Sequence, residues 1–578
     1  MKTITTIKQT IYQRINEALK EQNIEIEHKD LNYPQESNLG DISLALFSLA
    51  KTLKKDPKQI GSSLKSKLIN IDGVREVKLK GAYLNFFLDK SYFIDNLIKD
   101  ILGEKEKFGG SKDLKTQRIM IEFAHPNPFK VFHIGHLRNI VLGESLVRLF
   151  EFAKAKVIRT NYQGDVGMHI AKCLWSFKEI KSENYPDSSD ERVKLLGKCY
   201  AKGAEAFEKN EDAKKEIKEI NEKIYKQKDK FIQELWEIGK KWSLDKFQQI
   251  YKRLYTHFDR EYMESEVMID CLEYIKKAQD EKILEESEGA VIFPGEKYGL
   301  ETRVFINSQG LPTYDGKELG LAYREFTDFG KLDMCLHNVA IEQIGFFKVN
   351  FKVQELLDPD RFKAKQFHNA YEFVGLKKGK MSSRLGKVVL AEEVLDIVKK
   401  KIDLIVKSKP DSKLIKMDNY PELLENLTVS CVKYSFLKIS PFKYLSFDID
   451  ESVNFNGNSA LYLNYSYARI NSILKKVDKI KTLKKVSPYL SLDLEKEIFW
   501  QLIKFPEVVE KARLSYNPSE IVKYLFDLCK LFNDYYHQVP ILKSLTKEKQ
   551  ARLKMLKSIS QVLQNGANLL GFYLIKEM

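Results

Sequence analysis

The chain has 578 residues, too many for one hydrophobic core, so three or four domains of about 150 residues each are expected. Its 96 Lys and Arg against 81 Asp and Glu give a net charge of +15, which favours polyanionic partners but also suits a simple lysine-rich protein. Six scattered cysteines, no apolar run long enough for a membrane and no signal-peptide pattern exclude disulfide-rich, secreted and membrane-spanning proteins and predict a cytoplasmic one.

Residues 1–112 are expected to form a first, small α+β domain. A second helical segment is expected over residues 41–55, and residues 74–88 have a strand-like pattern. The pair Gly109 and Gly110, beside a lysine-rich stretch, predicts a linker to the next unit. The opening residues predict an amphipathic helix, since apolar side chains recur at helical spacing: Ile4, Ile7, Ile11, Ile15 and Leu19.

An apolar strand at residues 119–123 runs directly into a His-Ile-Gly-His turn and an amphipathic helix that ends near residue 152. The unpaired N–H groups and the positive dipole end of such a helix can hold phosphate. His133 and His136 would donate hydrogen bonds to phosphate oxygens, and the missing side chain of Gly135 would let a nucleotide approach the backbone. The alternative is a His-x-x-His metal pair, but no third ligand is obvious nearby and no protein-bound metal is expected.

From residue 115 onward, strands and helices alternate. A strand is expected at residues 156–162 and a helix at 169–180, which together with the first strand predict βαβ units and a parallel, doubly wound, Rossmann-like sheet. Ligands bind at the carboxyl ends of the strands in such a sheet, where the His-Ile-Gly-His turn lies. This Rossmann-like domain is expected to span residues 113–375, with a solvated helical insertion around 180–290, after which strands resume near residues 290–294 and 302–306.

A second phosphate-binding element is predicted at residues 379–387, GKMSSRLGK. This segment combines three cations, two hydroxyl groups and flanking glycines; lysine offers phosphate a point charge and arginine a forked one. Residues 376–455 are expected to hold this loop and a connecting helical region. Residues 456–578 are expected to form an all-helical, aromatic-rich domain.

The two phosphate motifs, HIGH and KMSSR, lie about 240 residues apart and resemble the ATP motifs of class I aminoacyl-tRNA synthetases. Their surroundings, EFAHPNPFKVFHIGHLRN at residues 122–139 and GLPTYDGKELGLA at residues 310–322, are similar to arginyl-tRNA synthetases. The resemblance covers nearly the whole chain. It implies an enzyme that joins arginine to tRNA(Arg).

The resemblance implies a two-step reaction in which ATP is a substrate. The arginine carboxylate attacks the α-phosphate to give arginyl-adenylate, and the 3′-terminal ribose of the tRNA then takes the arginyl group, with Mg²⁺ expected beside ATP. Ser383 stands where the class pattern KMSKS has its second lysine, so Arg384, Lys387 or Lys130 would supply the missing charge. Lys130 is favoured because it follows the first strand on the phosphate side. The loop residues expected to close over the pyrophosphate end are Lys380, Met381, Ser382, Ser383 and Arg384.

The resemblance also implies a pocket for arginine. A buried guanidinium requires carboxylates, because a desolvated and unpaired cation is very costly. Family positions indicate Glu122 and Glu318 as the two anions, Tyr314 as a residue that packs on or hydrogen-bonds the guanidinium plane, and Asn127 and Gln343 as contacts to the amino acid. The family usually has Asp at position 318, and an ordinary ion pair on a helix surface is the alternative for Glu318.

In the family, the N-terminal domain touches the outer corner of the tRNA and the helical C-terminal domain binds the anticodon. Asn85 and Phe87 are the candidates to meet a splayed base, and a core strand is the alternative for Phe87. Tyr465 and Tyr535 are candidates to stack on anticodon bases, although aromatic residues at this spacing also suit a helical core. Further candidates with the same alternative are Tyr462, Tyr467 and Tyr536.

Three rival functions fit parts of the pattern. A nucleotidylyltransferase for a smaller substrate can share the HxGH turn, but it would not need the two outer domains. A catalytically silent tRNA-binding relative is disfavoured by the intact HIGH motif and Lys380, and another synthetase of the same class is disfavoured by PTYDGKELGLA. A monomer is expected. Whether tRNA must be bound before arginine is activated stays open.

Overall fold

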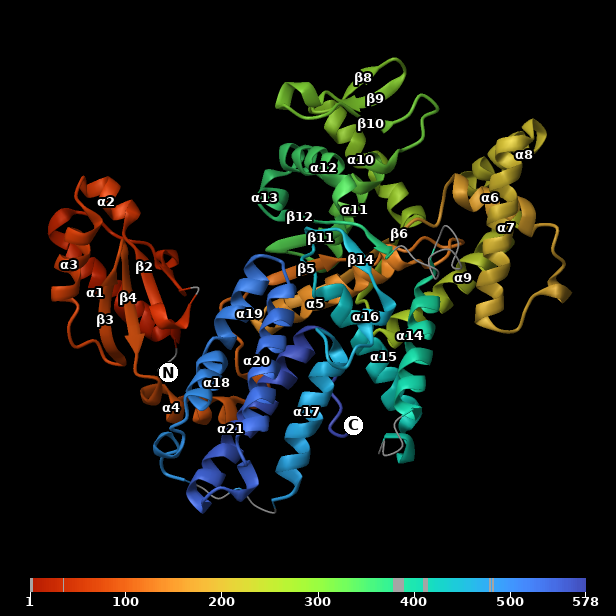
Figure 1. Ribbon diagram of the computed structural model, residues 1–578. Helices are drawn as coiled ribbons and strands as arrows, with labels where there is room; N and C mark the ends of the chain where they lie inside the picture. Colours follow the sequence, from red (N-terminus) through yellow and green to blue (C-terminus); the bar gives the residue numbers. More distant parts are fainter. Residues whose placement is uncertain (1–3, 35, 378–388, 409–413, 478–479, 481–482) are drawn as a thin grey trace.

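The computed structural model describes residues 4–34, 36–377, 389–408, 414–477, 480 and 483–578. A catalytic domain built on a parallel sheet lies at the centre, with the N-terminal domain on one side and the C-terminal helices below it (Figure 1). A bundle of inserted helices lies on the side opposite the N-terminal domain. The predicted fold class is confirmed.

The N-terminal domain packs helices against an antiparallel sheet of order β1-β2-β4-β3. The prediction of a helix over residues 41–55 was wrong in its first half, because residues 42–45 form β2 and pair with β1 and β4. Helix α1 is confirmed: Ile7, Ile11, Ile15 and Leu19 are all buried. The elements are α1 (Ile4–Leu19), β1 (Leu31–Asn32), β2 (Ile42–Ala45), α2 (Phe47–Leu53), α3 (Pro57–Lys67), β3 (Val74–Lys80) and β4 (Tyr83–Leu88).

Helix α4 (Lys90–Glu104) and the turn after it join the N-terminal domain to the rest of the molecule. This helix packs against α18 (Asp493–Ile503) and α21 (Thr546–Leu569) near the other end of the chain. The Asn565 side-chain amide donates hydrogen bonds to the carbonyls of Lys105 (2.9 Å) and Phe108 (3.0 Å). The segment before the predicted glycine linker is therefore bound to the C-terminal helices.

The central sheet has five parallel strands in the order β12-β11-β5-β6-β7. Helices α10, α11 and α12 lie on one side of it and α5 on the other (Figure 1). Glu122, the last residue of β5, pairs in register with His337 on β11 and Thr160 on β6. The elements are β5 (Arg118–Glu122), α5 (Ile134–Phe152), β6 (Lys156–Gln163), α6 (Met168–Phe177), β7 (Arg260–Met263), α10 (Glu264–Asp280), α11 (Tyr314–Phe329), β11 (Met334–Ala340), α12 (Ile344–Leu357), α13 (Pro359–Phe362) and β12 (Gln366–Tyr371).

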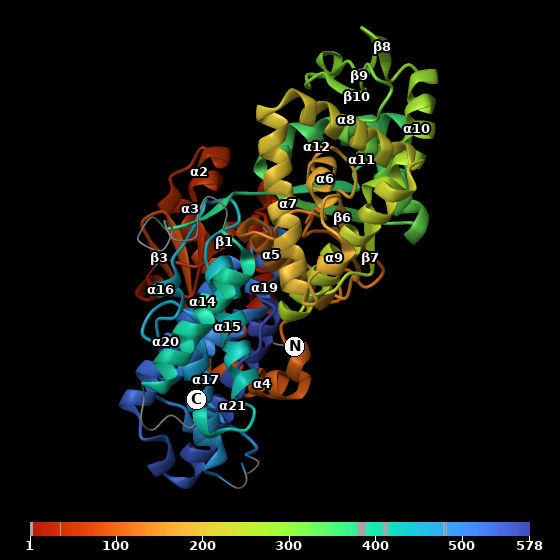
Figure 2. The same ribbon diagram turned by 90° about the vertical axis from the view of Figure 1, so that its right-hand side faces the viewer.

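The helical insertion is shorter than predicted. Helices α7 (Ser189–Lys209), α8 (Glu211–Lys226) and α9 (Lys230–Arg253) pack with α6 around a core of their own (Figure 2). Residues 260–263 instead form β7 of the central sheet; this short, charged strand gives no apolar run that a sequence pattern could detect. The strands predicted to resume after the insertion, β9 (Ala290–Phe293) and β10 (Arg303–Ile306), form a separate antiparallel sheet with β8 (Glu285–Ser287).

The remainder of the chain is mostly helical, as predicted. Two short strands, β13 (Val374–Leu376) and β14 (Leu445–Phe447), pair in parallel and join the catalytic domain to the helices that follow. The helices not yet introduced are α14 (Ala391–Lys407), α15 (Tyr420–Leu437), α16 (Ile449–Ser452), α17 (Ala460–Lys475), α19 (Phe505–Leu514) and α20 (Ser519–Gln538).

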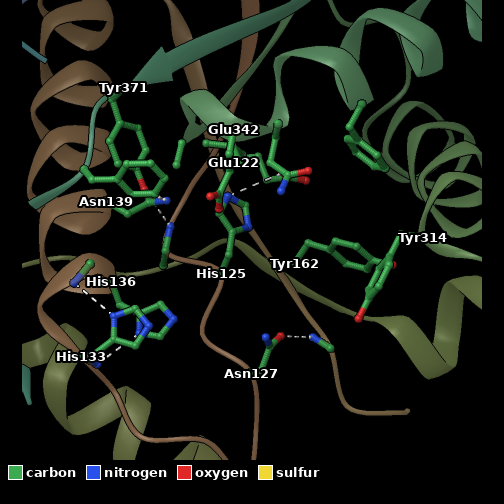
Figure 3. A pocket seen from close by; sticks show the side chains of 18 of the residues that line it. Glu122, His125, Asn127, His133, His136, Asn139, Tyr162, Tyr314, Glu342 and Tyr371 are labelled. Carbon is green, nitrogen blue, oxygen red and sulfur yellow. Dashed lines mark hydrogen bonds and ion pairs between the residues drawn. The ribbon is translucent and has the colours of Figure 1, made fainter. Parts of the chain in front are cut away.

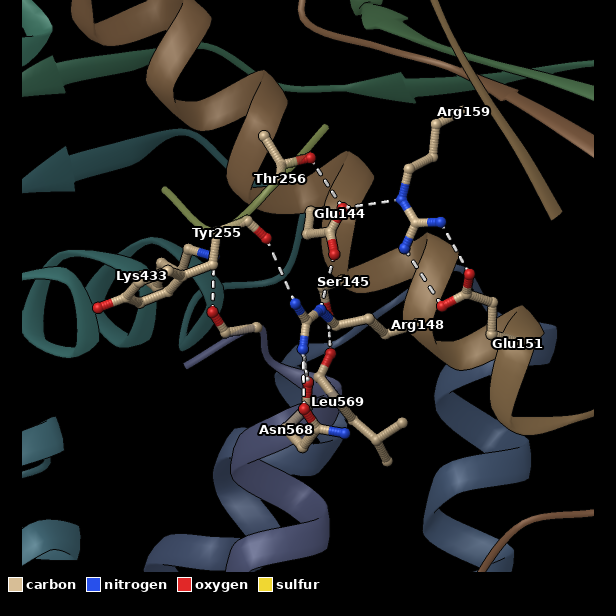
Figure 4. A network of polar contacts seen from close by, with 11 residues as sticks. Glu144, Ser145, Arg148, Glu151, Arg159, Tyr255, Thr256, Lys433, Asn568 and Leu569 are labelled. Carbon is tan, nitrogen blue, oxygen red and sulfur yellow. Dashed lines mark hydrogen bonds and ion pairs between the residues drawn. The ribbon is translucent and has the colours of Figure 1, made fainter. Parts of the chain in front are cut away.

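A buried polar network fastens the last helix to α5, the helix that begins with the His-Ile-Gly-His turn (Figure 4). Ser145 Oγ donates to the Leu569 carbonyl (2.9 Å), and Arg148 donates to the Asn568 carbonyl (3.0 Å). Lys433 is fully buried and donates to the Gly571 carbonyl (2.6 Å), and its burial lowers its pKa to about 7. Three chain segments therefore complete one another's hydrogen bonds around α5.

All six cysteines are free and buried, which fits the predicted core thiols. Within the ranges that the structure describes, every helix is too short or too polar to cross a membrane.

Candidate active site

A cleft of about 860 Å³ opens at the carboxyl ends of β5, β6, β11 and β12. The imidazoles of His133 and His136 lie at one side, Tyr314 at the other and Glu122 between them (Figure 3). The structure therefore brings together eight residues predicted from the sequence: Glu122, Asn127, His133, Gly135, His136, Tyr314, Glu318 and Gln343.

The loop between β5 and the imidazoles is held in an unusual backbone conformation. Ala124, His125 and Phe129 all have positive φ values (84°, 51° and 66°), a region that side chains other than glycine rarely adopt. Hydrogen bonds compensate this strain: Asn161 Oδ1 accepts from the His125 N–H (3.0 Å), and Asn127 Oδ1 accepts from the Gly164 N–H (2.9 Å). The loop is thereby fixed against the turn that follows β6.

The two imidazoles cap helix α5. The Gly135 N–H donates to His133 Nδ1 (3.1 Å), and the His133 N–H donates to His136 Nδ1 (3.2 Å). Burial and the charge of Lys130 lower the pKa of His133, and burial lowers that of His136 well below 6.5, so both rings are neutral. Because each Nδ1 accepts a hydrogen bond, each proton lies on Nε2, and both rings are left with a donor.

Gly135 leaves room for the His133 ring within the turn. A Cβ at this position would lie 2.9 Å from Cε1 and Nδ1 of the His133 ring. Any other residue would push this ring out of its capping position. The absent side chain is therefore explained by the packing of His133, whatever approach of a nucleotide it also permits.

The Tyr314 side of the cleft is acidic. Glu122 and Glu318 are almost fully buried, and Oε1 of Glu318 has no hydrogen-bond partner among the described residues. Burial and the charge of Glu122 raise the pKa of Glu318 to about 8. Glu318 is thus not an ordinary surface ion-pair residue. Tyr314 begins α11 and is largely exposed at the mouth of the cleft, and Gln343 lies between β11 and α12.

The residues KMSSR lie outside the described part of the chain: Lys380, Met381, Ser382, Ser383 and Arg384, with Lys387. The segments on either side of them do reach the cleft, which Leu376 and Val389 help to line. The Ile134 N–H donates to the Val389 carbonyl (2.9 Å), and the Ala391 N–H donates to the Phe132 carbonyl (3.0 Å). The chain after the KMSSR segment is therefore hydrogen-bonded to the turn that carries the imidazoles.

Lys130, the favoured substitute cation, does not line the cleft. It is half-buried, and burial lowers its pKa while the charge of Glu264, a cleft residue, opposes that shift. Its charge is close enough to depress the pKa of both His133 and His136.

Several polar residues of the site were missed by the sequence analysis. Asn139, on α5, accepts from the Ala124 N–H (2.8 Å) and donates to the carbonyl of Asn338 (2.9 Å) on β11 and to the Tyr371 hydroxyl (3.1 Å) on β12. Asn369 continues this chain by donating to Asn338 Oδ1 (2.9 Å). The available signal was a buried amide inside otherwise apolar elements, which is costly unless it is hydrogen-bonded.

The predicted tRNA contacts fall into two groups. Asn85 and Phe87 line a shallow groove of about 330 Å³ in the N-terminal domain that also contains Lys65, Lys78 and Lys80. Lys78 Nζ lies 5.0 Å from the centre of the half-buried Phe87 ring, so Phe87 belongs to a cationic surface groove and not to the centre of the core. The Asn85 side chain is buried, at 4% exposed, so Phe87 is the more accessible of the two. Their contact with RNA stays a prediction.

The C-terminal tyrosines require a correction. Tyr535 is fully buried, and its hydroxyl donates to Glu495 Oε1 (3.0 Å), so the prediction that it stacks on a base is wrong for this conformation. Tyr467 is also buried and Tyr462 is half-buried. Tyr465 and Tyr536 are exposed, and each ring lies 4.5 Å from the same guanidinium, that of Arg469.

Comparison with known proteins agrees with this geometry. A family model described as "tRNA synthetases class I (R), catalytic domain" matches residues 97–448, more than half of the chain. The chain belongs to the arginyl-tRNA synthetases. The "Arginyl tRNA synthetase N terminal domain" matches residues 5–88 and the "DALR anticodon binding domain" residues 463–578.

Two relatives show how far the similarity extends. An arginine–tRNA ligase of Treponema denticola is 31% identical over 94% of both chains, and one of Clostridium acetobutylicum is 30% identical over 99% of this chain and 100% of its own. The solved arginyl-tRNA synthetase of Thermus thermophilus covers 99% of this chain at a TM-score of 0.82 with 23% identity, and all of its own length is covered. That of Plasmodium falciparum covers 99% of both chains at 0.81 with 20% identity. These structures share the whole fold with this arginyl-tRNA synthetase.

Proposed function

We propose that the cleft activates L-arginine with ATP to give arginyl-adenylate and then transfers the arginyl group to the 3′-terminal ribose of tRNA(Arg). The observation that carries this proposal is the composition of one cleft: neutral imidazole donors at the start of a helix on one side, and buried carboxyl groups on the other. The first set suits phosphate and the second a guanidinium.

The imidazole side would bind ATP. The Nε2–H groups of His133 and His136, together with the positive end of α5, donate to phosphate oxygens as negative charge moves toward pyrophosphate. Because the Nδ1 lone pair of each ring already accepts a backbone N–H and Nε2 carries the proton, the rings stabilise the reaction as donors and not as bases. The cations of the KMSSR segment, Lys380 and Arg384, are proposed to complete the site. The cleft position of Leu376 and Val389 supports this proposal.

ATP is proposed to enter as its magnesium complex. Among the described residues, no group of three or more His, Cys, Asp or Glu side chains is placed to hold a metal ion. The phosphates would therefore be the main ligands of Mg²⁺, and no step is assigned to the metal.

The carboxyl side would bind arginine. Glu122 and Glu318 would accept hydrogen bonds from the N–H groups of the guanidinium, and the exposed Tyr314 ring would pack over its plane. Asn127 and Gln343 would hold the amino-acid backbone and present the carboxylate to the α-phosphate. A lysine side chain would fit the two carboxyl groups less well, because its ammonium is a compact point charge without the planar fork of donors that a guanidinium has.

Pyrophosphate exchange tests the proposal. We expect ATP–pyrophosphate exchange that depends on arginine and is absent with citrulline, which keeps the shape of arginine but has no charge. The assay is run with and without tRNA, because a tRNA requirement is open. Exchange with a substrate other than arginine would indicate another synthetase or a nucleotidylyltransferase, and no exchange under any condition would indicate a silent relative.

The contacts with tRNA are proposed to include the groove at Asn85 and Phe87 and the surface at Tyr465. Replacing Tyr465 by alanine should raise the KM for tRNA about 5- to 100-fold, since stacking on one base contributes about 1–3 kcal/mol. Its matched control is Tyr535→Phe, which removes only the buried hydroxyl bonded to Glu495. The control should lower the unfolding free energy by about 1 kcal/mol and leave the KM unchanged. An unchanged KM in the Tyr465 variant would contradict the contact.

A monomeric state and a cytoplasmic location stay predictions from the sequence.

A further inference from the structure

Three carboxyl groups and one imidazole are buried together beneath the Tyr314 side of the cleft. Glu122 ends β5 and His337 lies beside it on β11, while Glu318 and Glu325 lie seven residues apart on one face of α11. Each of these side chains is at most 4% exposed. We call these four residues the buried acidic cluster; Glu122 and Glu318 are its two members that line the cleft.

The contacts of His337 indicate a doubly protonated ring. Nδ1 lies 3.3 Å from Glu122 Oε1, and Nε2 lies 2.8 Å from Gln366 Oε1. A neutral imidazole has one donor and one acceptor, whereas both partners here are acceptors. Phe347 and Phe351 lie 5.0 and 5.4 Å from the ring and shield it from water. His337 is therefore a buried imidazolium whose counter-ion is Glu122.

One cation cannot balance three carboxylates in such a site, so two of the carboxyl groups hold protons. Burial and the charge of Glu122 raise the pKa of Glu318 to about 8, and burial with the same charge raises that of Glu325 well above its usual value. Burial alone would lower the pKa of His337, but the opposite effect of the Glu122 charge is larger, and the pKa rises to about 9. Burial opposes the ionisation of Glu122, but the charge of His337 outweighs the effect of burial and lowers the pKa of Glu122. The other titratable groups that face the cluster are His125, Tyr162, Asp315, Cys335 and His368.

We propose that His337 is a specificity-determining positioning residue of the arginine pocket, which holds Glu122 ionised while Glu318 releases its proton when the guanidinium binds. The Glu318 carboxylic acid loses H⁺ to solvent, the resulting carboxylate pairs with the guanidinium, and no bond of arginine changes. Among the described residues, Glu318 Oε1 has no hydrogen-bond partner at the cleft and is free for this pairing, as is Glu122 Oε2 beside it. The inference rests on the proposed function, since it assumes that arginine occupies this side of the cleft.

This arrangement makes arginine affinity depend on pH in a defined direction. Below pH 8 the empty pocket carries a proton that the occupied pocket lacks, so raising the pH favours binding. His337 keeps its charge over the same range, because its pKa lies higher. A neutral analogue such as citrulline displaces no proton and gains nothing from higher pH.

Titration calorimetry of the full chain with arginine at pH 6, 7 and 8, in two buffers of different ionisation heat, counts the protons. We expect about one proton released per arginine at pH 7, and an affinity that rises about tenfold from pH 6 to pH 7 and less toward pH 8. An affinity that is constant from pH 6 to pH 8, with no proton released, would overturn the inference and leave the proposed function standing. Binding of ATP without any binding of arginine would overturn the proposed function itself.

Variants separate positioning from mere structural support. Glu318→Gln should abolish the proton release and flatten the pH dependence. His337→Gln removes the counter-ion of Glu122, so the number of protons released should rise from one toward two. The matched control is His368→Gln, because His368 is the register neighbour of His337 on β12 but its ring Nε2 bonds the Val339 carbonyl (2.9 Å) and no carboxyl group among the described residues. It should still release one proton.

The inference would be overturned if His337→Gln bound arginine more weakly but still released one proton. His337 would then have a structural role only. Thermal unfolding of each variant verifies that it is folded. The proton count of the unaltered protein needs no variant, so a count of zero overturns the inference even if a variant fails to fold.

Discussion

Replacing His136 by asparagine is expected to lower the rate of arginine-dependent pyrophosphate exchange about 10²- to 10³-fold while the unfolding temperature stays close to that of the unaltered protein. The asparagine oxygen can accept the His133 N–H in place of Nδ1, so the cap of α5 is kept. What is lost is the Nε2–H donor at the phosphate side of the cleft. Exchange is measured with tRNA present and compared with thermal unfolding.

The matched control for this variant is His136→Gln, whose amide nitrogen falls near the position of Nε2. It restores a donor and should recover about tenfold of the lost rate. Near-normal exchange in the asparagine variant would contradict the phosphate assignment. Near-normal exchange in the asparagine variant with a loss in the glutamine variant, together with a lowered unfolding temperature of the latter, would indicate that His136 acts through the helix cap alone.

Replacing Glu122 by glutamine is expected to weaken arginine binding by about 2–5 kcal/mol, roughly 30-fold to several thousand-fold, with little effect on ATP. The substitution keeps the shape of the side chain and removes the only carboxyl group of the buried acidic cluster that is ionised before arginine arrives. A buried guanidinium would then face an uncharged amide, which compensates its desolvation poorly. Dissociation constants of arginine and ATP, measured separately, test this expectation.

Glu342→Gln is the control for the glutamine variant. Glu342 also lines the cleft, but its side chain is exposed and its charge is screened by water. The control should change arginine affinity less than about threefold. Equal weakening of arginine and ATP by Glu122→Gln would indicate a damaged cleft and would contradict a guanidinium contact.

Sequence patterns predicted those elements whose apolar periodicity matches their burial. Helix α1 shows a single buried face, and β5 is an apolar run followed by the turn that caps α5. Tertiary pairing overrode local preference at β2, where residues that read as helix lie between two strands. Strand β7 could not be found at all, because two of its four residues, Arg260 and Glu261, are charged and it owes its place to pairing with β6.

The candidate site followed from motif spacing, but its interior did not. His337 and Glu325 lie in segments without a motif, and only the register of β11 beside β5 and the turn of α11 bring them to Glu122. Tyr535 was instead predicted as a site residue although it is buried. The sequence alone does not show whether an aromatic residue in a helix faces solvent or, like Tyr535, a buried partner such as Glu495. Both cases depend on contacts between distant segments, and the residue spacing within one segment does not predict such contacts.

Helix α5 acts as a rigid rod of about 28 Å between two functions. At one end it presents the imidazoles to the cleft, and in its other half Ser145 and Arg148 donate to the carbonyls of Leu569 and Asn568 at the end of the last helix. A displacement of that last helix would thus be transmitted along the rod, since no loop lies between to absorb it. Excising the catalytic unit would also leave the buried Lys433 without its Gly571 acceptor and remove the Asn568 acceptors of Arg148. The units matched by the three family models are therefore joined by buried hydrogen bonds.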